Sequence, residues 1–157
     1  MNKKHIAVVM GGYSSEFEIS LKSGDVVCDF IDSNKYEDAK KIYKELGGSS
    51  PILKLTTEQA AALELKLNKD DNLSNYKCFV VMRCWHPRAE DIVKEVINYG
   101  PHEIILMPLY PQYSAATSGS SIKEWNDICA KKNLNVKTST ICCYPTDENF
   151  IKAHTAK

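Results

Sequence analysis

Short apolar runs alternate along the chain with longer segments in which apolar residues recur every three or four positions. This alternation predicts a parallel β-sheet, because parallel strands are apolar on both faces and are joined by crossover helices. The expected fold class is therefore α/β, with a three-layer parallel sheet flanked by helices. We predict its strands over residues 6–10, 78–83, 103–109 and 136–142.

Helical patterns follow the predicted strands, and three of them open with a capping-box pattern. In this pattern a Ser or Thr precedes a Glu or Gln by three residues, as Ser15 precedes Glu18, Thr56 precedes Gln59 and Ser121 precedes Glu124. We predict helices from residue 15, over 38–47, from 56, over 89–99, over 122–132 and from 147 onward.

The segments that follow the predicted strands carry the side chains of greatest chemical interest. They read GGYSSE, RCWHPRAE, YPQYSAATSGSS and CYPTDE. In a parallel sheet, ligands bind beyond the carboxyl ends of the strands. We therefore expect a binding site at this edge of the sheet.

Charge and composition exclude several classes of protein. The chain has 20 Lys and Arg against 20 Asp and Glu, so its net charge is zero, which argues against a basic nucleic-acid-binding protein. Its first apolar run is too short for a secretory signal, and no segment reaches the length of a transmembrane span. We expect one compact cytoplasmic domain with no nucleic-acid partner, and the pattern leaves the oligomeric state open.

The six cysteines lack the C-x-x-C spacing of a zinc or redox site. Adjacent Cys142 and Cys143 fall in a predicted strand, where they would point to opposite faces and could not chelate one ion together. The pattern favours small buried residues in a reducing compartment over a disulfide framework or a metal site.

Several motifs occur in the order found in a known enzyme family. They are YKELGGSSPIL, FVVMRCWHPRAED, PLYPQYSAATSGSS and STICCYP. Through them, residues 38–157 closely resemble an internal stretch of ferrochelatase, the family that inserts ferrous iron into protoporphyrin IX. The resemblance implies a chelatase-like, Rossmann-like half-domain of haem biosynthesis. It also implies ferrous iron and protoporphyrin IX as substrates, with no tightly bound cofactor.

The resemblance places part of the family's porphyrin cleft on the segment after the second predicted strand. Arg83 matches a family arginine, and it either meets a porphyrin propionate or pairs with nearby carbonyls or with Glu90. His86, of the His-Pro pair, is either a metal ligand or a hydrogen-bonded structural histidine. Cys84 stands where the family often has an aromatic residue.

The motif YPQYS matches a family loop that lines the same cleft. Its two tyrosine rings either pack on the macrocycle or close the end of the sheet. The following Gly-Ser-Ser precedes a predicted helix start, whose free N–H groups suit a carboxylate or phosphate. The resulting cleft candidates are Arg83, Cys84, His86, Tyr110, Gln112, Tyr113, Ser114, Ser120 and Ser121.

Residues 1–37 instead resemble the start of D-alanine–D-alanine ligase, through IAVVMGGYSSEFEISLKSG. Glu16 matches the ligase residue near the amino group of the first D-alanine, although a Glu in a first helical turn is also favourable for helix-dipole reasons. Together the two resemblances predict a fusion of units 1–37 and 38–157. The ligase-like strand would replace the first strand of the ferrochelatase sheet.

The family's catalytic His motif, Ser-x-His-Gly/Ser-x-Pro, and its catalytic Glu lie downstream of the matched segment, and this chain ends at Lys157 before both. His154 does not match that motif and is predicted to be a polar helix residue. We therefore expect no catalytic residue and no metal site here, and an inactive or porphyrin-binding half-enzyme. Two alternatives stay open: a D-alanine–D-alanine ligase fragment, and a non-catalytic tetrapyrrole- or metal-binding module.

Overall fold

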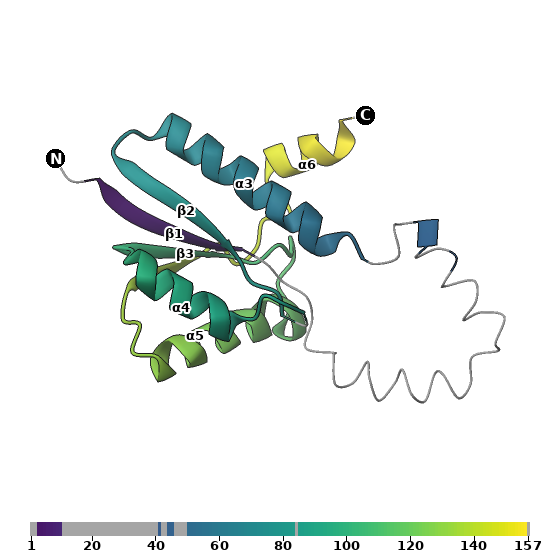
Figure 1. The fold of residues 1–157 in the computed structure, drawn as a ribbon. Helices are drawn as coiled ribbons and strands as arrows, with labels where there is room; N and C mark the ends of the chain where they lie inside the picture. Colours follow the sequence, from purple (N-terminus) through teal and green to yellow (C-terminus); the bar gives the residue numbers. More distant parts are fainter. Residues whose placement is uncertain (1–2, 11–40, 42–43, 46–49, 84, 157) are drawn as a thin grey trace, which may run out of the picture.

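A computed structural model describes residues 3–10, 41, 44–45, 50–83 and 85–156 of the chain (Figure 1). The predicted helix from residue 15, the candidate residues Glu16 and Cys84, and most of the predicted helix 38–47 lie outside these residues.

The described strands form one parallel sheet in the order β2-β1-β3-β4. The central strand β1 pairs with both β2 and β3, and Val8 lies opposite Cys78 on one side and Ile105 on the other. The predicted parallel sheet is confirmed. Its strands are β1 (Lys4–Met10), β2 (Ser74–Val80), β3 (Glu103–Met107) and β4 (Lys137–Thr140).

Helices cover both faces of the sheet, so the predicted three-layer α/β architecture is confirmed. Figure 1 shows α4 and α5 on one face and α3 on the other. The helices are α3 (Ile52–Asp70), α4 (Ala89–Tyr99), α5 (Ser120–Lys131) and α6 (Glu148–Thr155). Among the described residues, no helix combines the length and apolar composition needed to span a bilayer.

Two cores lie against the two faces of the sheet. Alternation along β3 divides its side chains between them, because successive residues of a strand point to opposite faces. Ile104 and Leu106 belong to the core under α4 and α5, whereas Ile105 and Met107 pack in the core under α3. Val93 and Val96 of α4 are fully buried in the first core.

Two of the predicted capping boxes are wrong. Helix α3 begins at Ile52, so Thr56 lies inside it, and Leu55 N already donates to Pro51 O. Ser121 likewise lies inside α5, which begins at Ser120 and has no side-chain cap. In both places regular helical hydrogen bonding begins upstream of the box and occupies the backbone that the box would cap.

Strands β2, β3 and β4 end before the apolar runs that predicted them, whereas β1 ends at the predicted Met10. Strand β2 ends at Val80, three residues before Arg83, and Met82 N donates to Pro87 O instead of to a strand. Strand β4 ends at Thr140, so Cys142 and Cys143 lie beyond it. These shorter strands lengthen the loops that carry most of the candidate residues.

Candidate functional site

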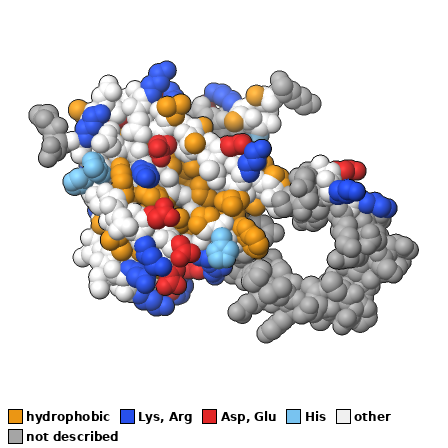
Figure 2. All heavy atoms as spheres, in the orientation of Figure 1, with side chains coloured by type: hydrophobic (Ala, Val, Ile, Leu, Met, Phe, Trp, Pro, Cys, Tyr) orange, Lys and Arg blue, Asp and Glu red, His pale blue; other side chains and the backbone are white. Residues whose placement is uncertain are grey.

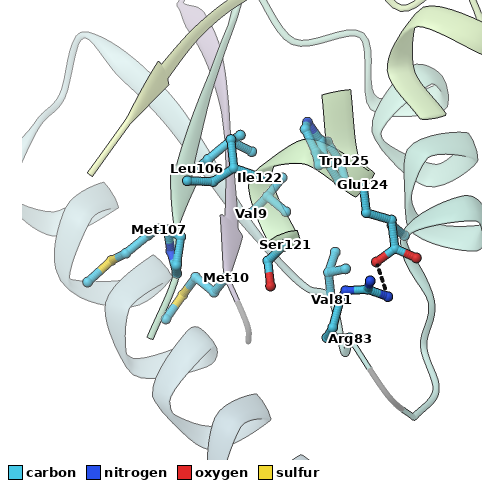
Figure 3. Close-up of a pocket in the computed structure, with 12 residues that line it drawn as sticks. Val9, Met10, Val81, Arg83, Leu106, Met107, Ser121, Ile122, Glu124 and Trp125 are labelled. Atoms are coloured by element: carbon cyan, nitrogen blue, oxygen red, sulfur yellow. Dashed lines mark ion pairs between the residues drawn. The ribbon is translucent and has the colours of Figure 1, made fainter. Parts of the chain in front are cut away.

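A small cavity of about 40 Å³ opens at the carboxyl ends of β1, β2 and β3, the edge where the sequence predicts a ligand (Figure 3). Aliphatic side chains form most of its lining, and Arg83, Ser121, Glu124 and Trp125 add polar groups. A water needs roughly 10–15 Å³ of such volume, so the cavity holds a few waters and not a macrocycle. It is a recess in a larger surface.

Buried polar atoms without partners lie around this recess. Arg83 Nε, Ser121 Oγ and Trp125 Nε1 make no hydrogen bond within the described part of the chain. Figure 3 shows the Ser121 hydroxyl directed into the space between Met10 and Arg83. Because buried donors are nearly always satisfied, the recess suits a ligand that accepts hydrogen bonds.

At the rim of the recess, the carboxylate of Glu124 forms ion pairs with two arginines. Glu124 Oε2 lies 3.0 Å from Arg83 Nη1, and Glu124 Oε1 lies 3.0 Å from Arg88 Nη2. Two guanidinium groups against one carboxylate leave a net positive charge, which favours an anionic ligand. The side chains of Arg83 and Glu124 are both largely buried, so this pair is weakly screened by solvent.

Of the alternatives considered for Arg83, the pairing with Glu90 does not occur in the structure. Glu90 is exposed in the first turn of α4 and lies 3.5 Å from Lys132 Nζ. Glu124 faces the end of β2 from α5 and takes the place predicted for Glu90. Sequence reasoning missed Glu124 as a site residue because it interpreted this glutamate as part of a capping box. No local signal marks a partner 41 positions away, from Arg83 to Glu124.

The YPQYS loop lies beside the recess but does not line it. Tyr110 is half-buried, whereas Gln112 and Tyr113 are exposed. Ser114 caps η1, a π-helical turn over Ala115–Gly119, because its Oγ accepts from Thr117 N at 3.1 Å. Of the described candidates, Arg83 and Ser121 meet at the recess and the others do not.

The expected anion site at the Gly-Ser-Ser segment is not formed by free N–H groups. Gly119 N donates to Ser114 O at 3.0 Å, and the backbone N–H of Ser120 donates to Thr117 O. The helical run begins upstream at Ala115, which occupies these donors. The Ser120 hydroxyl also bonds inward, to Ala116 O at 2.9 Å and to Thr117 O at 3.0 Å.

His86 is exposed, and its ring centroid lies 6.0 Å from that of Trp85. Among the described residues its imidazole has no hydrogen-bond partner, and both interpretations of His86 stay predictions. No group of three or more potential ligands that could hold a metal ion occurs among the described His, Cys, Asp and Glu. His154 lies in α6 with its Nδ1 3.0 Å from Phe150 O, as expected for a polar helix residue.

The cysteines divide into two kinds. Burial raises the pKa of the Cys78 and Cys129 thiols to about 11, as expected for small buried residues. Cys142 and Cys143 differ, because their sulphur atoms lie 3.0 Å apart. The prediction that these two point to opposite faces is wrong, since β4 ends before them and strand alternation does not apply.

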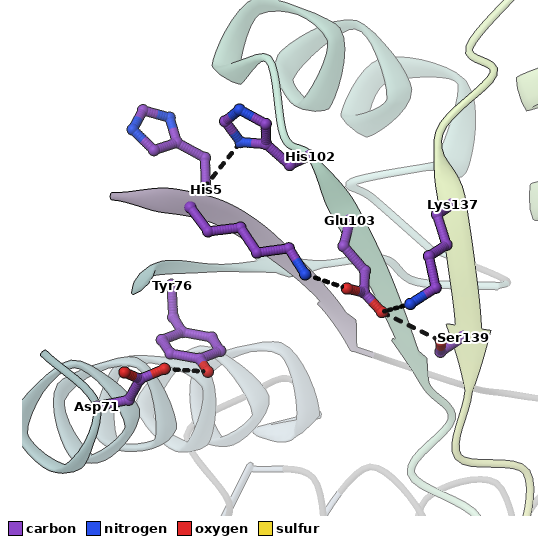
Figure 4. Close-up of polar contacts among 8 residues, drawn as sticks. His5, Asp71, Tyr76, His102, Glu103, Lys137 and Ser139 are labelled. Carbon is purple, nitrogen blue, oxygen red and sulfur yellow. Dashed lines mark hydrogen bonds and ion pairs between the residues drawn. The ribbon is translucent and has the colours of Figure 1, made fainter. Parts of the chain in front are cut away.

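The opposite, amino-terminal edge of the sheet carries a second polar cluster (Figure 4). Glu103 lies 2.6 Å from Lys4 Nζ and 3.1 Å from Lys137 Nζ, so it joins β1, β3 and β4. Hydrogen bonds from these two ammonium groups lower the pKa of Glu103 to about 2. The cluster binds strands together at the end away from the recess, and we assign it a structural role.

The sequence of the chain is similar to those of known proteins of one family. The Ferrochelatase family model matches residues 17–157. The chain is 70% identical over 125 residues to a ferrochelatase of Pelagibacter ubique, covering 80% of this chain and 36% of that protein. It is 44% identical over 130 residues to a ferrochelatase of Wolbachia sp. subsp. Drosophila simulans, covering 83% and 41%.

A ferrochelatase of Rickettsia bellii is 40% identical over 131 residues, covering 83% of this chain and 36% of that protein. The chain thus spans well under half the length of the curated relatives that it matches. The family model also includes residues 17–37, part of the segment that resembles the ligase. The ligase resemblance and the division after residue 37 stay predictions.

Proposed function

The chain belongs to the ferrochelatase family, and from that premise we propose that its recess binds a carboxylate of a porphyrin substrate. The family acts in haem biosynthesis, and its protoporphyrin IX carries two propionates on a flat apolar ring. A single observation carries this assignment: Arg83 Nε and Ser121 Oγ are buried without partners at an apolar recess.

Exposed aromatic side chains near this edge supply a surface for the ring. Trp85 is 63% exposed and Tyr113 is 57% exposed, both high for large apolar residues. Figure 2 shows hydrophobic side chains gathered across the middle of the face that it presents, with a histidine among them. Aromatic faces suit a macrocycle by stacking, while the Tyr113 hydroxyl stays hydrated. We propose that the described residues form one side of a porphyrin cleft.

Metal insertion also needs a base that removes the pyrrole protons. Glu124 is the carboxylate among the residues that line the recess, and two guanidinium groups already occupy it. Both of its oxygens are engaged in these ion pairs, which leaves neither free to accept a proton from the substrate. We therefore propose that this chain binds porphyrin without inserting iron.

The binding proposal is tested by titrating the purified chain with protoporphyrin IX and following the quenching of its two tryptophans. Arg83→Gln should weaken binding about tenfold, the effect of losing roughly 1.4 kcal/mol. Arg88→Gln is the matched control, because Arg88 pairs with the same Glu124 but does not line the recess. The dimethyl ester of the porphyrin should bind all three proteins alike. Equal weakening in both variants, or undiminished binding of the ester to the unmodified chain, would refute the carboxylate site.

Iron insertion is measured separately, with ferrous iron and protoporphyrin under anaerobic conditions and an intact ferrochelatase as control. We expect no rate above that of the protein-free mixture. Turnover that disappears in His86→Ala would instead make this chain a minimal chelatase.

We also propose a cytoplasmic location for the chain. The four described cysteines are free thiols, and reducing compartments keep thiols in this state.

A further inference from the structure

Two adjacent cysteines follow β4 and bring their sulphur atoms together. Cys142 Sγ and Cys143 Sγ lie 3.0 Å apart, and both residues lie beyond the strand. Cys143 is exposed and Cys142 is half-buried, so reagents from solvent reach the pair. Nothing in the proposed porphyrin recess uses these thiols, because neither residue lines it.

We propose that Cys142 and Cys143 form a thiol–disulfide exchange site that closes reversibly into a disulfide between neighbouring residues. The oxidant is a low-molecular-weight disulfide of the glutathione class. One protein thiolate attacks it, forming a mixed disulfide and releasing one small thiolate. The second cysteine, after losing its proton to solvent, attacks the protein-bound sulphur and releases the other small thiolate. Two protein thiols become one S–S bond, and the small disulfide is reduced to two thiols.

The environment of the pair favours exchange there over the other described cysteines. Access distinguishes this pair, because thiol–disulfide exchange requires the small disulfide to reach the attacking sulphur, and Cys143 is exposed beside the half-buried Cys142. Cys78 and Cys129 are held as neutral thiols because burial raises their pKa to about 11. Among the four described cysteines, exchange reactivity is therefore concentrated at residues 142–143.

Formation of a disulfide between Cys142 and Cys143 affects the cleft through the next residue, Tyr144. Tyr144 N donates to Pro111 O at 2.9 Å, and the Tyr144 hydroxyl donates to Pro108 O at 3.3 Å. Pro108 lines the recess, and Pro111 belongs to the YPQYS loop. Neighbouring Cα atoms lie about 3.8 Å apart, closer than the roughly 4.4–6.8 Å usual for a disulfide. Closure must therefore rearrange the backbone at 142–143 and loosen the contacts of Tyr144.

The experiment treats the purified full chain with oxidised glutathione, blocks remaining thiols with iodoacetamide and digests with trypsin. Cleavage after Lys137 and Lys152 releases residues 138–152, a peptide in which Cys142 and Cys143 are the cysteines present. We expect this peptide to be lighter by two hydrogen atoms, to carry no alkyl group and to regain both thiols with dithiothreitol. Peptides with Cys78 or Cys129 should be alkylated only after denaturation.

Cys142→Ser and Cys143→Ser are the matched controls, since each keeps one thiol and lacks the second. Each variant should accumulate a glutathione adduct that persists at least about tenfold longer than the adduct of the unmodified chain. A stable adduct, a disulfide between two chains, or two alkylated cysteines in the unmodified chain would overturn the proposal.

Hydrogen exchange at the Tyr144 amide tests the structural consequence. Oxidation should accelerate that exchange about tenfold, because its bond to Pro111 O opens more often. An unchanged rate in the oxidised chain would refute the coupling to the cleft. Porphyrin binding plays no part in these measurements, so they can succeed or fail independently of the proposed function.

Discussion

The guanidinium of Arg83 is anchored by Glu124, whose Oε2 lies 3.0 Å from Arg83 Nη1. This pair joins the end of β2 to the second turn of α5 and leaves Arg83 Nε buried beside the recess without a partner. The carboxylate thus orients the guanidinium and leaves one donor unused. Glu124 acts through Arg83, as a positioning residue.

Replacing Glu124 by Gln should destabilise the chain. The variant leaves Arg83 largely buried with its charge unpaired, which costs about 2 kcal/mol by analogy with other hydrogen bonds to charged groups. For a domain of this size, the loss corresponds to roughly 4–8 °C in Tm by thermal denaturation. Asp127→Asn on the same helix is the control, because the Lys123–Asp127 pair is exposed and should contribute less than about 0.5 kcal/mol. Equal shifts in the two variants would contradict the anchoring role.

Acid should weaken the sheet through Glu103. Its pKa is lowered from 4.5 to about 2 by Lys4 and Lys137, so the folded chain stabilises the ionised form. That stabilisation is complete above pH 4.5 and is lost as the pH falls from there through about 2. In Glu103→Gln, the free energy of unfolding should therefore fall less steeply across this window. Glu148→Gln, which changes an exposed pair in α6, should keep the slope of the unmodified chain. Denaturant titrations at several pH values measure both slopes.

Loss of the Ser114 cap should destabilise the whole chain. Ser114 Oγ accepts from Thr117 N at 3.1 Å at the start of the helical run that continues into α5. Ser114→Ala should cost about 1 kcal/mol, or roughly 2–4 °C in Tm. Asp147→Ala removes a comparable cap from α6, none of whose residues is buried. It should reduce the helical circular-dichroism signal slightly with little change in Tm, and an equal Tm loss in both would count against this reasoning.

A methyl group at Gly119 should meet the Tyr113 ring. A Cβ at Gly119 would lie 2.8 Å from Tyr113 Oη and 3.3 Å from Ser114 O. Gly119→Ala should therefore displace the Tyr113 ring and lower Tm, and Tyr113→Phe in the same chain should restore part of the loss by removing the closest atom. A double-mutant cycle of unfolding free energies measures this coupling. Additive effects of the two substitutions would show that the ring and Gly119 are not in contact.

Local patterns predicted the elements that apolar spacing governs. Helix α4 begins and ends at the predicted residues, 89 and 99, because its buried stripe is regular and Gly100 ends it with a positive φ of 62°. Strands β1 and β3 were predictable for the same reason, since buried parallel strands are continuous apolar runs. The carboxyl end of β2 was not, because the loop residues Val81 and Met82 are also buried or half-buried.

Contacts between segments far apart in the chain could not be predicted from the sequence. Ser121 and Glu124 fit a capping box by spacing, yet Glu124 pairs with arginines that lie 36 and 41 positions before it. The thiol pair was missed because strand alternation was extended past Thr140, where β4 ends. A pattern rule applies only inside its element, and Arg83, Cys142 and Cys143 lie just beyond the strands that precede them. The family resemblance indicated the carboxyl edge of the sheet as the site. The partner of Arg83 could be identified only from the three-dimensional structure.

The central position of β1 has a consequence for synthesis of the chain on the ribosome. Its register partners come 70 positions later in β2, from Lys4 to Ser74, and 97 positions later in β3, from Ile6 to Glu103. At roughly 5–20 residues per second, about 5–20 seconds pass before both neighbours of β1 have been synthesised. Over that interval the nascent strand presents two unpaired edges, so we expect it to depend on a chaperone that binds short extended apolar segments.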